Sequence, residues 1–245
     1  QDGQIDNRRR LMRALEAACA RRGVEFEEGS EVLALHTDGG ALRGLELRRV
    51  DGQRHRLDCD EAVLACGAWS AKLLPQLPVF PVKGQMLSLQ APRQALRRVV
   101  FGPGTYLVPR DDGLVVVGAT SEPEAAFAAG LTPDGQKRLE AGIAALLPAA
   151  ALWPPMERWW GFRPCTPDQG PLLGPGLIEG LWLATGHHRI GVLWAAFTAE
   201  LLGEAMLAAT GGEMVTALGQ GDDGLTALER ERFLEQFRWG RFGPT

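Results

Sequence analysis

The chain has 245 residues and a mass of 26.5 kDa, and its 45% hydrophobic and 23% charged residues exclude a disordered or collagen-like protein. The 26 basic and 30 acidic residues give a net charge of −4, which argues against nucleic-acid binding and against a basic membrane-binding surface. The four cysteines form no CxxC pair, so we expect free thiols in a reducing cytoplasm.

The first predicted element is an amphipathic helix. Apolar side chains recur at helical spacing from Leu11 to Cys19, Asp6 or Asn7 can cap the start, and Gly23 ends the pattern. A short strand is predicted at 24–26. An antiparallel meander then covers 31–35, 44–50 and 53–59.

Two strand–turn–helix segments follow the pattern of a parallel sheet. Residues 62–66 form a continuous apolar run, typical of a strand covered on both faces, and Gly67 turns directly into a predicted helix at 70–74. A second apolar strand at 181–184 leads through the turn at 186–191 into a long helix. Such turns offer backbone N–H groups to an anion.

The pattern between these two segments is antiparallel. Its predicted elements are strands at 82–89, 106–109 and 114–118, a helix at 132–147 and an aromatic strand at 159–164. We therefore predict an α/β (α+β) fold in which an antiparallel-sheet domain interrupts a parallel-sheet layer, with a ligand between the two. The expected division is 1–76, 77–160, 161–212 and a C-terminal tail with a helix at 213–245.

The most apolar stretch is 191–209. It contains Glu200 and Glu204 four residues apart, so a buried helix with one wet side is favoured over a membrane span. A Gly- and Asp-rich segment and a charged helix at 225–237 complete the chain.

Several motifs are absent or misleading. The sequence has no nucleophile elbow, no Walker-type loop, no HExxH and no histidines at metal-ligand spacing, so we expect no metal site. One GxGxxG match, at 219–224, contains two aspartates that would repel a pyrophosphate, and too little chain follows it to complete a nucleotide-binding unit. We interpret it as a polar loop.

Three side chains are candidates for binding a carboxylate. Arg163 lies in the aromatic strand and Arg189 in the glycine-flanked turn, and two arginines in one cleft would bind a carboxylate bidentately. Structural salt bridges are the alternative. Tyr106, the only tyrosine, either adds a hydrogen bond to the same group or packs as an amphipathic residue.

The turn at 186–191 is a candidate for binding a group that becomes electron-rich. The N–H groups of Gly191, Val192 and Leu193 lie at the positive end of the predicted helix dipole, which would suit the pyrimidine edge of a reduced flavin. A tight turn without a ligand is the alternative.

Four ordered motifs complete the pattern: PVKGQML at 81–87, YLVPR at 106–110 with VGAT at 117–120, GFRPCTPD at 161–168 and ATGHHRIG at 184–191. With them, roughly residues 1–210 resemble the glycine oxidase and D-amino-acid oxidase family of FAD-dependent amine oxidoreductases, and most of all the glycine oxidases of thiamine biosynthesis. The resemblance implies that 1–76 and 161–212 belong to an FAD-binding domain and that 77–160 bind the substrate.

The resemblance also implies roles for individual residues. Arg163 would be the main clamp on the substrate carboxylate, Tyr106 would add a hydrogen bond, and Arg189 would lie near flavin and substrate. Around the flavin it places Gly186, His187, Gly191, Val192 and Leu193 at the isoalloxazine ring, Val32 on the adenine side, and Cys66, Gly67 and Trp69 near the pyrophosphate. Cys165 does not match the tethering cysteine of sarcosine oxidases, so the FAD is expected to be non-covalent.

The implied reaction is oxidative deamination of a small amino acid, glycine above all, to glyoxylate, ammonia and hydrogen peroxide, with molecular oxygen as the acceptor and thiamine thiazole synthesis as the use. Alternatives are a sarcosine or D-amino-acid oxidase, or an inactive fragment that does not bind FAD alone. The family's N-terminal glycine-rich segment is not in the sequence. We therefore expect the carboxy-terminal part of a longer cytoplasmic oxidase, with a homo-oligomer or a chain supplying the N-terminal half as its partner and neither nucleic acid nor membrane.

Overall fold

The structure, a computed structural model, describes residues 5–6, 10–211 and 225–243. The chain separates into two compact units. Unit 1 comprises Gln1–Val24 and Pro81–Arg163, and unit 2 comprises Glu25–Phe80 and Pro164–Thr245. The junctions thus fall at 80/81 and 163/164, where the sequence predicted boundaries at 76/77 and 160/161, and residues 1–24 group with the inserted segment.

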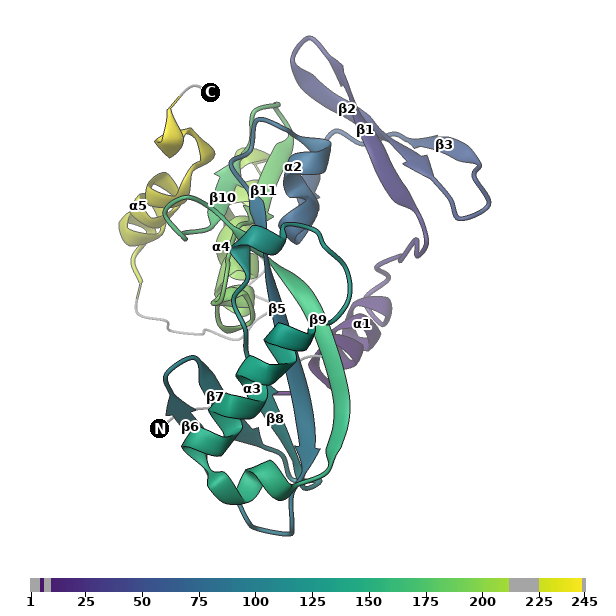
Figure 1. Ribbon diagram of the computed structural model, residues 1–245. Coiled ribbons are helices and arrows are strands. Elements are labelled where there is room, and N and C mark those ends of the chain that lie inside the picture. The colour runs from purple at the N-terminus through teal and green to yellow at the C-terminus, as the bar shows by residue number, and fades with distance from the viewer. Residues whose placement is uncertain (1–4, 7–9, 212–224, 244–245) are drawn as a thin grey trace. The chain divides into compact units, whose positions relative to one another are not determined.

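Unit 1 is built on a five-stranded sheet in the order β6-β7-β8-β5-β9. Its strands are β5 (Phe80–Gln90), β6 (Val100–Gly102), β7 (Thr105–Pro109), β8 (Leu114–Gly118) and β9 (Pro155–Cys165). The pairs β7–β8 and β5–β8 are antiparallel, as the sequence predicted. Strand β6, which the sequence did not predict, also pairs antiparallel with β7. Helix α3 (Pro133–Leu146) runs across one face of this sheet (Figure 1).

The core of unit 1 lies between that face and α3. Alternate strand residues supply it, for example Leu87, Leu107 and Val117, and α3 contributes Leu139 and Ile143. Because side chains alternate across a strand, the residues between these positions lie on the opposite face of the sheet.

The two helices of unit 1 begin in different ways. At α3 the hydroxyl of Thr132 accepts a hydrogen bond from the N–H of Gly135 (3.1 Å), the capping that the Thr-Pro start predicted. Before helix α1 (Met12–Ala20), the backbone carbonyl of Asp6 accepts from the N–H groups of Arg10 (3.2 Å) and Leu11 (2.9 Å), and the predicted start at Asp6 or Asn7 stays a prediction. The alternative cap, Asn7, lies outside the described residues.

Unit 2 contains two three-stranded sheets. One is the predicted meander of β1 (Glu31–Asp38), β2 (Ala41–Arg48) and β3 (Arg54–Leu57). The other has the order β10-β11-β4 and consists of β4 (Ala62–Leu64), β10 (Leu172–Pro175) and β11 (Leu181–Thr185). Strands β4 and β11 are parallel. The mixed α/β class with an antiparallel insert is therefore confirmed.

Two local expectations before residue 80 are wrong. Residues 24–26 form no strand, and Val24 and Phe26 are each about half exposed, so neither has the packing that stabilises a strand. Strand β4 is not covered on both faces, because Val63 is 43% exposed while Leu64 is buried. After β4 the chain forms a 3₁₀ turn and the short helix α2 (Ser70–Leu73), as predicted.

Helices α4 (Gly191–Ala209) and α5 (Ala227–Phe237) pack against each other. Arg230 of α5 forms ion pairs with Glu200 (3.0 Å) and Glu204 (3.1 Å) of α4. The carboxylates that made one side of α4 look wet are therefore paired with α5. The prediction of a buried helix is wrong, because only Thr198, Leu201 and Leu202 of α4 are buried. By length and composition alone α4 could cross a membrane, although it carries these two paired carboxylates.

The GxGxxG match at 219–224 lies outside the described residues. All four cysteines are free, as expected from the absence of a disulfide framework. Among the described residues there is no cluster of three or more side chains that could hold a metal ion.

Candidate functional site

The face of the unit 1 sheet that points away from α3 carries two of the predicted site residues. Arg163 of β9 extends over Gly84 of β5. A Cβ atom added to Gly84 would overlap with Nη1 of Arg163 and would lie 2.6 Å from Nη2 and 2.7 Å from Cζ. The guanidinium therefore occupies the space that a side chain at position 84 would take.

The second residue on this face is Tyr106 of β7. It pairs in register with Gly118 of β8, and a Cβ atom on Gly118 would lie 2.7 Å from Cε2 of the tyrosine and closer still to its hydroxyl. The phenol thus lies over Gly118 as the guanidinium of Arg163 lies over Gly84. The structure places the cation and the phenol on one face of one sheet, above two glycines.

A backbone carbonyl oxygen just after β8 accepts a hydrogen bond from Arg163. Its Nη1 donates to the carbonyl oxygen of Thr120 at 3.2 Å. A guanidinium has five N–H groups in a fork geometry that suits a carboxylate.

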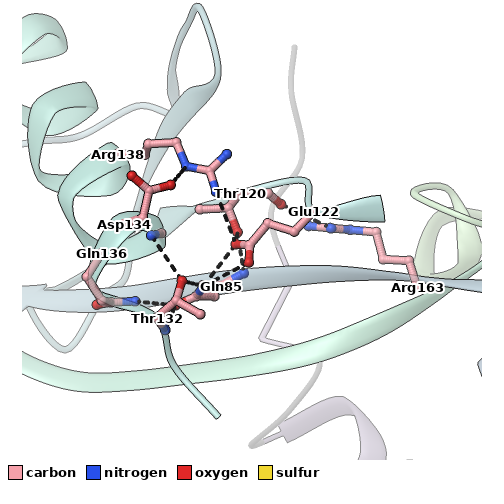
Figure 2. A network of polar contacts seen from close by, with 9 residues as sticks. Gln85, Thr120, Glu122, Thr132, Asp134, Gln136, Arg138 and Arg163 are labelled. Atoms are coloured by element: carbon pink, nitrogen blue, oxygen red, sulfur yellow. Dashed lines mark hydrogen bonds and ion pairs between the residues drawn. The ribbon is translucent and has the colours of Figure 1, made fainter. Parts of the chain in front are cut away.

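Sequence reasoning missed a buried polar cluster on the opposite, α3-facing side of the same sheet (Figure 2). Gln85, Thr120 and Glu122 are each at most 6% exposed and are hydrogen-bonded to one another. The motif at 81–87 was noticed, but Gln85 was given no role. The available signal was a Gln at a position that strand alternation assigns to the apolar core.

The turn between β11 and α4 in unit 2 is formed as predicted. Gly186 is buried with φ +78°, a conformation that favours glycine, and a Cβ there would lie 2.9 Å from Thr166. The N–H of His188 donates to the carbonyl of Pro164 at 2.8 Å. Helix α4 starts at Gly191, so the first amides of the helix, including those of Val192 and Leu193, have no intrahelical acceptor. The side chains of Val192 and Leu193 are exposed, as is Arg189.

The segment after β4 meets this turn. Strands β4 and β11 are parallel, so their carboxyl ends lie at the same edge of the sheet. The hydroxyls of Ser70 and Thr185 are hydrogen-bonded to each other at 2.7 Å, and the carbonyl of Gly67 lies 2.7 and 3.1 Å from them as a further acceptor. The structure therefore brings two of the predicted flavin segments together, 67–70 and 185–191.

The side chains around Gly67 differ in environment. Trp69 is 46% exposed, and Gly67 has φ +53° with open space where a Cβ would be. Burial raises the pKa of the Cys66 thiol, so it stays protonated at neutral pH. Val32 lies apart from this edge, on β1 of the meander, where it pairs with Leu47.

An apolar groove of about 440 Å³ lies beside the turn, with Val63, Ala184, Gly191 and Thr198 in its lining. His187 also lines it, and its Nε2 is 3.0 Å from the hydroxyl of Thr198. Burial lowers the pKa of His187 below its ordinary value, so the imidazole is neutral at pH 7. The groove is therefore uncharged and suits an apolar ring system better than an ion.

Comparison with known proteins identifies relatives at the level of sequence. The family model for FAD dependent oxidoreductases matches residues 1–205. The chain is 44% identical over 211 residues to the bifunctional protein ThiO/ThiG of Synechocystis. This match covers 84% of this chain and 31% of that protein. It is 37% identical over 203 residues to the glycine oxidase of Pseudomonas aeruginosa, covering 80% of this chain and 54% of the relative.

Solved structures agree. The glycine oxidase of Geobacillus kaustophilus is 31% identical with a TM-score of 0.73, over 85% of this chain and 55% of that one. The L-proline dehydrogenase of P. horikoshii, 18% identical, has the same fold with a TM-score of 0.74. The chain spans between about a third and rather more than half the length of these proteins. Because the family model covers most of it, the chain belongs to the FAD dependent oxidoreductase family, whose cofactor is FAD.

Proposed function

We propose that the protein to which this chain belongs oxidises a small amino acid with bound FAD, and that the amino acid is glycine. The products are glyoxylate, ammonia and hydrogen peroxide, and the reaction feeds thiamine thiazole synthesis. One observation carries the proposal: Arg163 and Tyr106 lie over Gly84 and Gly118 on a single sheet face. The similarity to glycine oxidases and to ThiO/ThiG proteins supports the choice of substrate.

The residues of unit 2 fit a non-covalent flavin. The apolar groove with its neutral His187, the amides of Gly191, Val192 and Leu193, and the open backbone at Gly67 offer an apolar wall and N–H donors. Gly186, Cys66 and Trp69 belong to the same edge of the sheet. Val32 on the adenine side and Arg189 near flavin and substrate are further parts of the proposal. When bound, FAD accepts a hydride equivalent from the substrate Cα and passes electrons to dioxygen.

The protein's own side chains have a positioning task. Arg163 binds the carboxylate through charge-assisted hydrogen bonds, and Tyr106 donates a further hydrogen bond. A carboxylate held at two sites has few orientations left, which presents the C–H bond in one direction.

The same proposal covers the remainder of the FAD site, the partner chains and the cellular location. Relatives are longer than this chain, so we propose that the remainder of the FAD site comes from chain outside residues 1–245 or from a second chain, with a homo-oligomer as the other candidate partner. We place the protein in the cytoplasm, without a membrane or nucleic-acid partner, because the charge is mildly negative.

A D-amino acid or a secondary amine is the second candidate substrate. The chain is 32% identical to the D-amino acid dehydrogenase of Methylobacterium nodulans over 197 residues, and 27% identical to the iminodiacetate oxidase of Chelativorans with a TM-score of 0.71. These substrates also carry a carboxylate, so Arg163 would serve them equally. A substrate panel separates them.

The test is a visible absorption spectrum of the purified, FAD-reconstituted protein before and after anaerobic addition of glycine, sarcosine or D-alanine. We expect flavin bands near ~450 nm that glycine bleaches fastest. Arg163→Ala should weaken binding of the carboxylate by about 2–4 kcal/mol, because a charge-assisted bidentate contact is lost. An unchanged KM for glycine in Arg163→Ala would refute the clamp, and colourless protein after reconstitution would support an inactive fragment.

A further inference from the structure

The buried polar cluster of unit 1 is unusual for its place in the fold. Gln85 is fully buried and Glu122 is 4% exposed, on the face of the sheet that otherwise holds Leu87 and Leu89 against α3. Burying an amide and a carboxylate in such a layer is unfavourable unless their hydrogen bonds are satisfied. Such a cluster can have one of two roles. It fixes helix α3, or it fixes a residue on the opposite face of the sheet.

The side chain of Gln85 is the centre of the cluster (Figure 2). Its Nε2 donates to both carboxylate oxygens of Glu122, at 2.9 and 3.1 Å, and to the hydroxyl of Thr132 at 2.7 Å. Its Oε1 accepts from the N–H of Thr132 (3.0 Å) and from Nε2 of Gln136 (3.1 Å). Both ends of the amide are therefore engaged, and its orientation is fixed.

Thr120 connects this cluster to Arg163. Its hydroxyl accepts from the N–H of Gln85 (2.8 Å) and donates to the carboxylate of Glu122, and its own N–H donates to the carbonyl of Gln85 (3.1 Å). The N–H of Glu122 in turn donates to the carbonyl of Lys83 (2.9 Å). The segment 120–122 is thus held by backbone and side chains together, and its Thr120 carbonyl is the acceptor for Nη1 of Arg163.

We propose that Gln85 and Glu122 are positioning residues for Arg163: from the α3-facing side of the sheet they fix the Thr120 carbonyl, which sets the direction of the guanidinium on the opposite face. The inference rests on the proposed role of Arg163 as the carboxylate clamp. Gly84, the neighbour of Gln85, completes the arrangement, because the same strand that carries the buried amide leaves the space into which the guanidinium fits.

A purely structural cluster would behave differently. It would hold α3 through its N-cap Thr132, and its loss would lower stability while leaving the bound carboxylate undisturbed. If Gln85 and Glu122 instead position Arg163, removing either of them lowers the affinity for a carboxylate selectively. The probe is acetate, a carboxylate without an amine, whose Kd is measured by calorimetry on the FAD-reconstituted protein, alongside KM and kcat for glycine.

The variants are Gln85→Met, which keeps the volume, Glu122→Gln, and the exchange Gln85→Glu with Glu122→Gln, which restores a carboxylate–amide pair. We expect each single variant to raise the acetate Kd and the glycine KM about 10-fold, with kcat changed less than about twofold. The exchange should recover most of the affinity. Leu139→Ala on α3 is the control, since it loses core packing without touching the cluster and should leave the acetate Kd unchanged.

A second readout is the ¹⁵N–¹H resonance of the Arg163 guanidinium, assigned from its loss in Arg163→Lys. It should broaden or shift in the single variants and return in the exchange. Unchanged acetate affinity in folded single variants, or an equal loss in Leu139→Ala, would overturn the inference; if Gln85→Met does not fold, Glu122→Gln and the exchange decide. Unchanged acetate affinity in Arg163→Ala would instead remove the proposed function of Arg163.

Discussion

The guanidinium of Arg163 takes the place of a side chain on Gly84: a Cβ atom there would lie 2.7 Å from Cζ of the arginine. Both residues belong to strands of one sheet, and both lie on the face away from α3. Glycine is therefore needed at position 84 to leave room for the arginine side chain, and not because of the backbone conformation there.

Gly84→Ala should consequently act as a displacement of Arg163. We expect acetate affinity to fall by about 10- to 100-fold, because the guanidinium must move away from the Thr120 carbonyl. Calorimetry with acetate measures the loss. Gly161→Ala is the matched control on β9, because a Cβ there has no atom within 4 Å, and it should bind acetate like the parent protein. Equal affinity in both variants would show that Arg163 tolerates the displacement.

Tyr106→Phe removes one hydroxyl from the same face. We expect a loss of about 0.5–1.5 kcal/mol in carboxylate binding, the ordinary size of one hydrogen bond, and a matching rise in the KM for glycine. Phe101→Leu is the control, because its ring centroid lies 6.1 Å from that of Tyr106 and the substitution changes packing without removing a hydroxyl. If Phe101→Leu reproduces the loss, Tyr106 acts through packing.

His187 should make the stability of unit 2 depend on pH. Burial lowers its pKa below the ordinary 6.5, so the unfolded chain binds a proton more readily than the folded one. Stability is therefore full above pH 6.5 and falls as the pH drops below it, with a slope of at most about 1.4 kcal/mol per pH unit. Urea unfolding of the parent and of His187→Gln between pH 5 and 8 measures this. The slope should flatten in His187→Gln but persist in His36→Gln.

The C-terminal segment should stabilise the loop that follows β9. Arg241 donates to Asp168 through Nε (2.7 Å) and Nη2 (2.9 Å), and Nη2 also reaches the carbonyl of Gly170 (2.9 Å). The bond from Arg241 is the main reason that the pKa of Asp168 is lowered to about 2. Because the folded pKa is depressed, this stabilisation is present above pH 4 and is lost as the pH falls toward 2.

Arg241→Met should therefore raise the pKa of Asp168 toward its ordinary 3.8, measured by NMR titration of the carboxyl carbon. The Asp168 side chain is 45% exposed, so solvent screening limits the loss of stability to about 1 kcal/mol. Arg238→Met removes a nearby charge that pairs with Glu235 and serves as the control. A pKa near 2 in Arg241→Met would show that the remaining hydrogen bonds of Asp168 are enough to lower its pKa without Arg241.

Local patterns predicted much of the fold. The meander, the insert strands, the capped start of α3 and the turn at 186–191 all depend on turn residues and periodicity within short segments. The strand predicted at 24–26 was placed wrongly, because weak local patterns decide little where burial is slight.

Contacts between distant residues could not be predicted in the same way. Gln85 binds Glu122, 37 residues away, and Arg230 binds Glu200, 30 residues away. Strand alternation marks Gln85 as a core position, but nothing local in the sequence marks the partner of any of these side chains. Arg163 and Tyr106 were identified because a glycine-rich aromatic strand and a single tyrosine are conspicuous, and because the family resemblance added their roles.

The parallel pairing of β4 with β11 has a consequence for the order of folding. The hydroxyl pair of Ser70 and Thr185 joins residues 115 positions apart, and the chain between the two strands includes all of 81–163. Closing so long a loop in a disordered chain is entropically unfavourable, whereas a folded insert shortens it. We expect the local hairpins of 81–163 to assemble early and the parallel strands late, so the edge that carries the flavin segments is among the last parts of the protein to form.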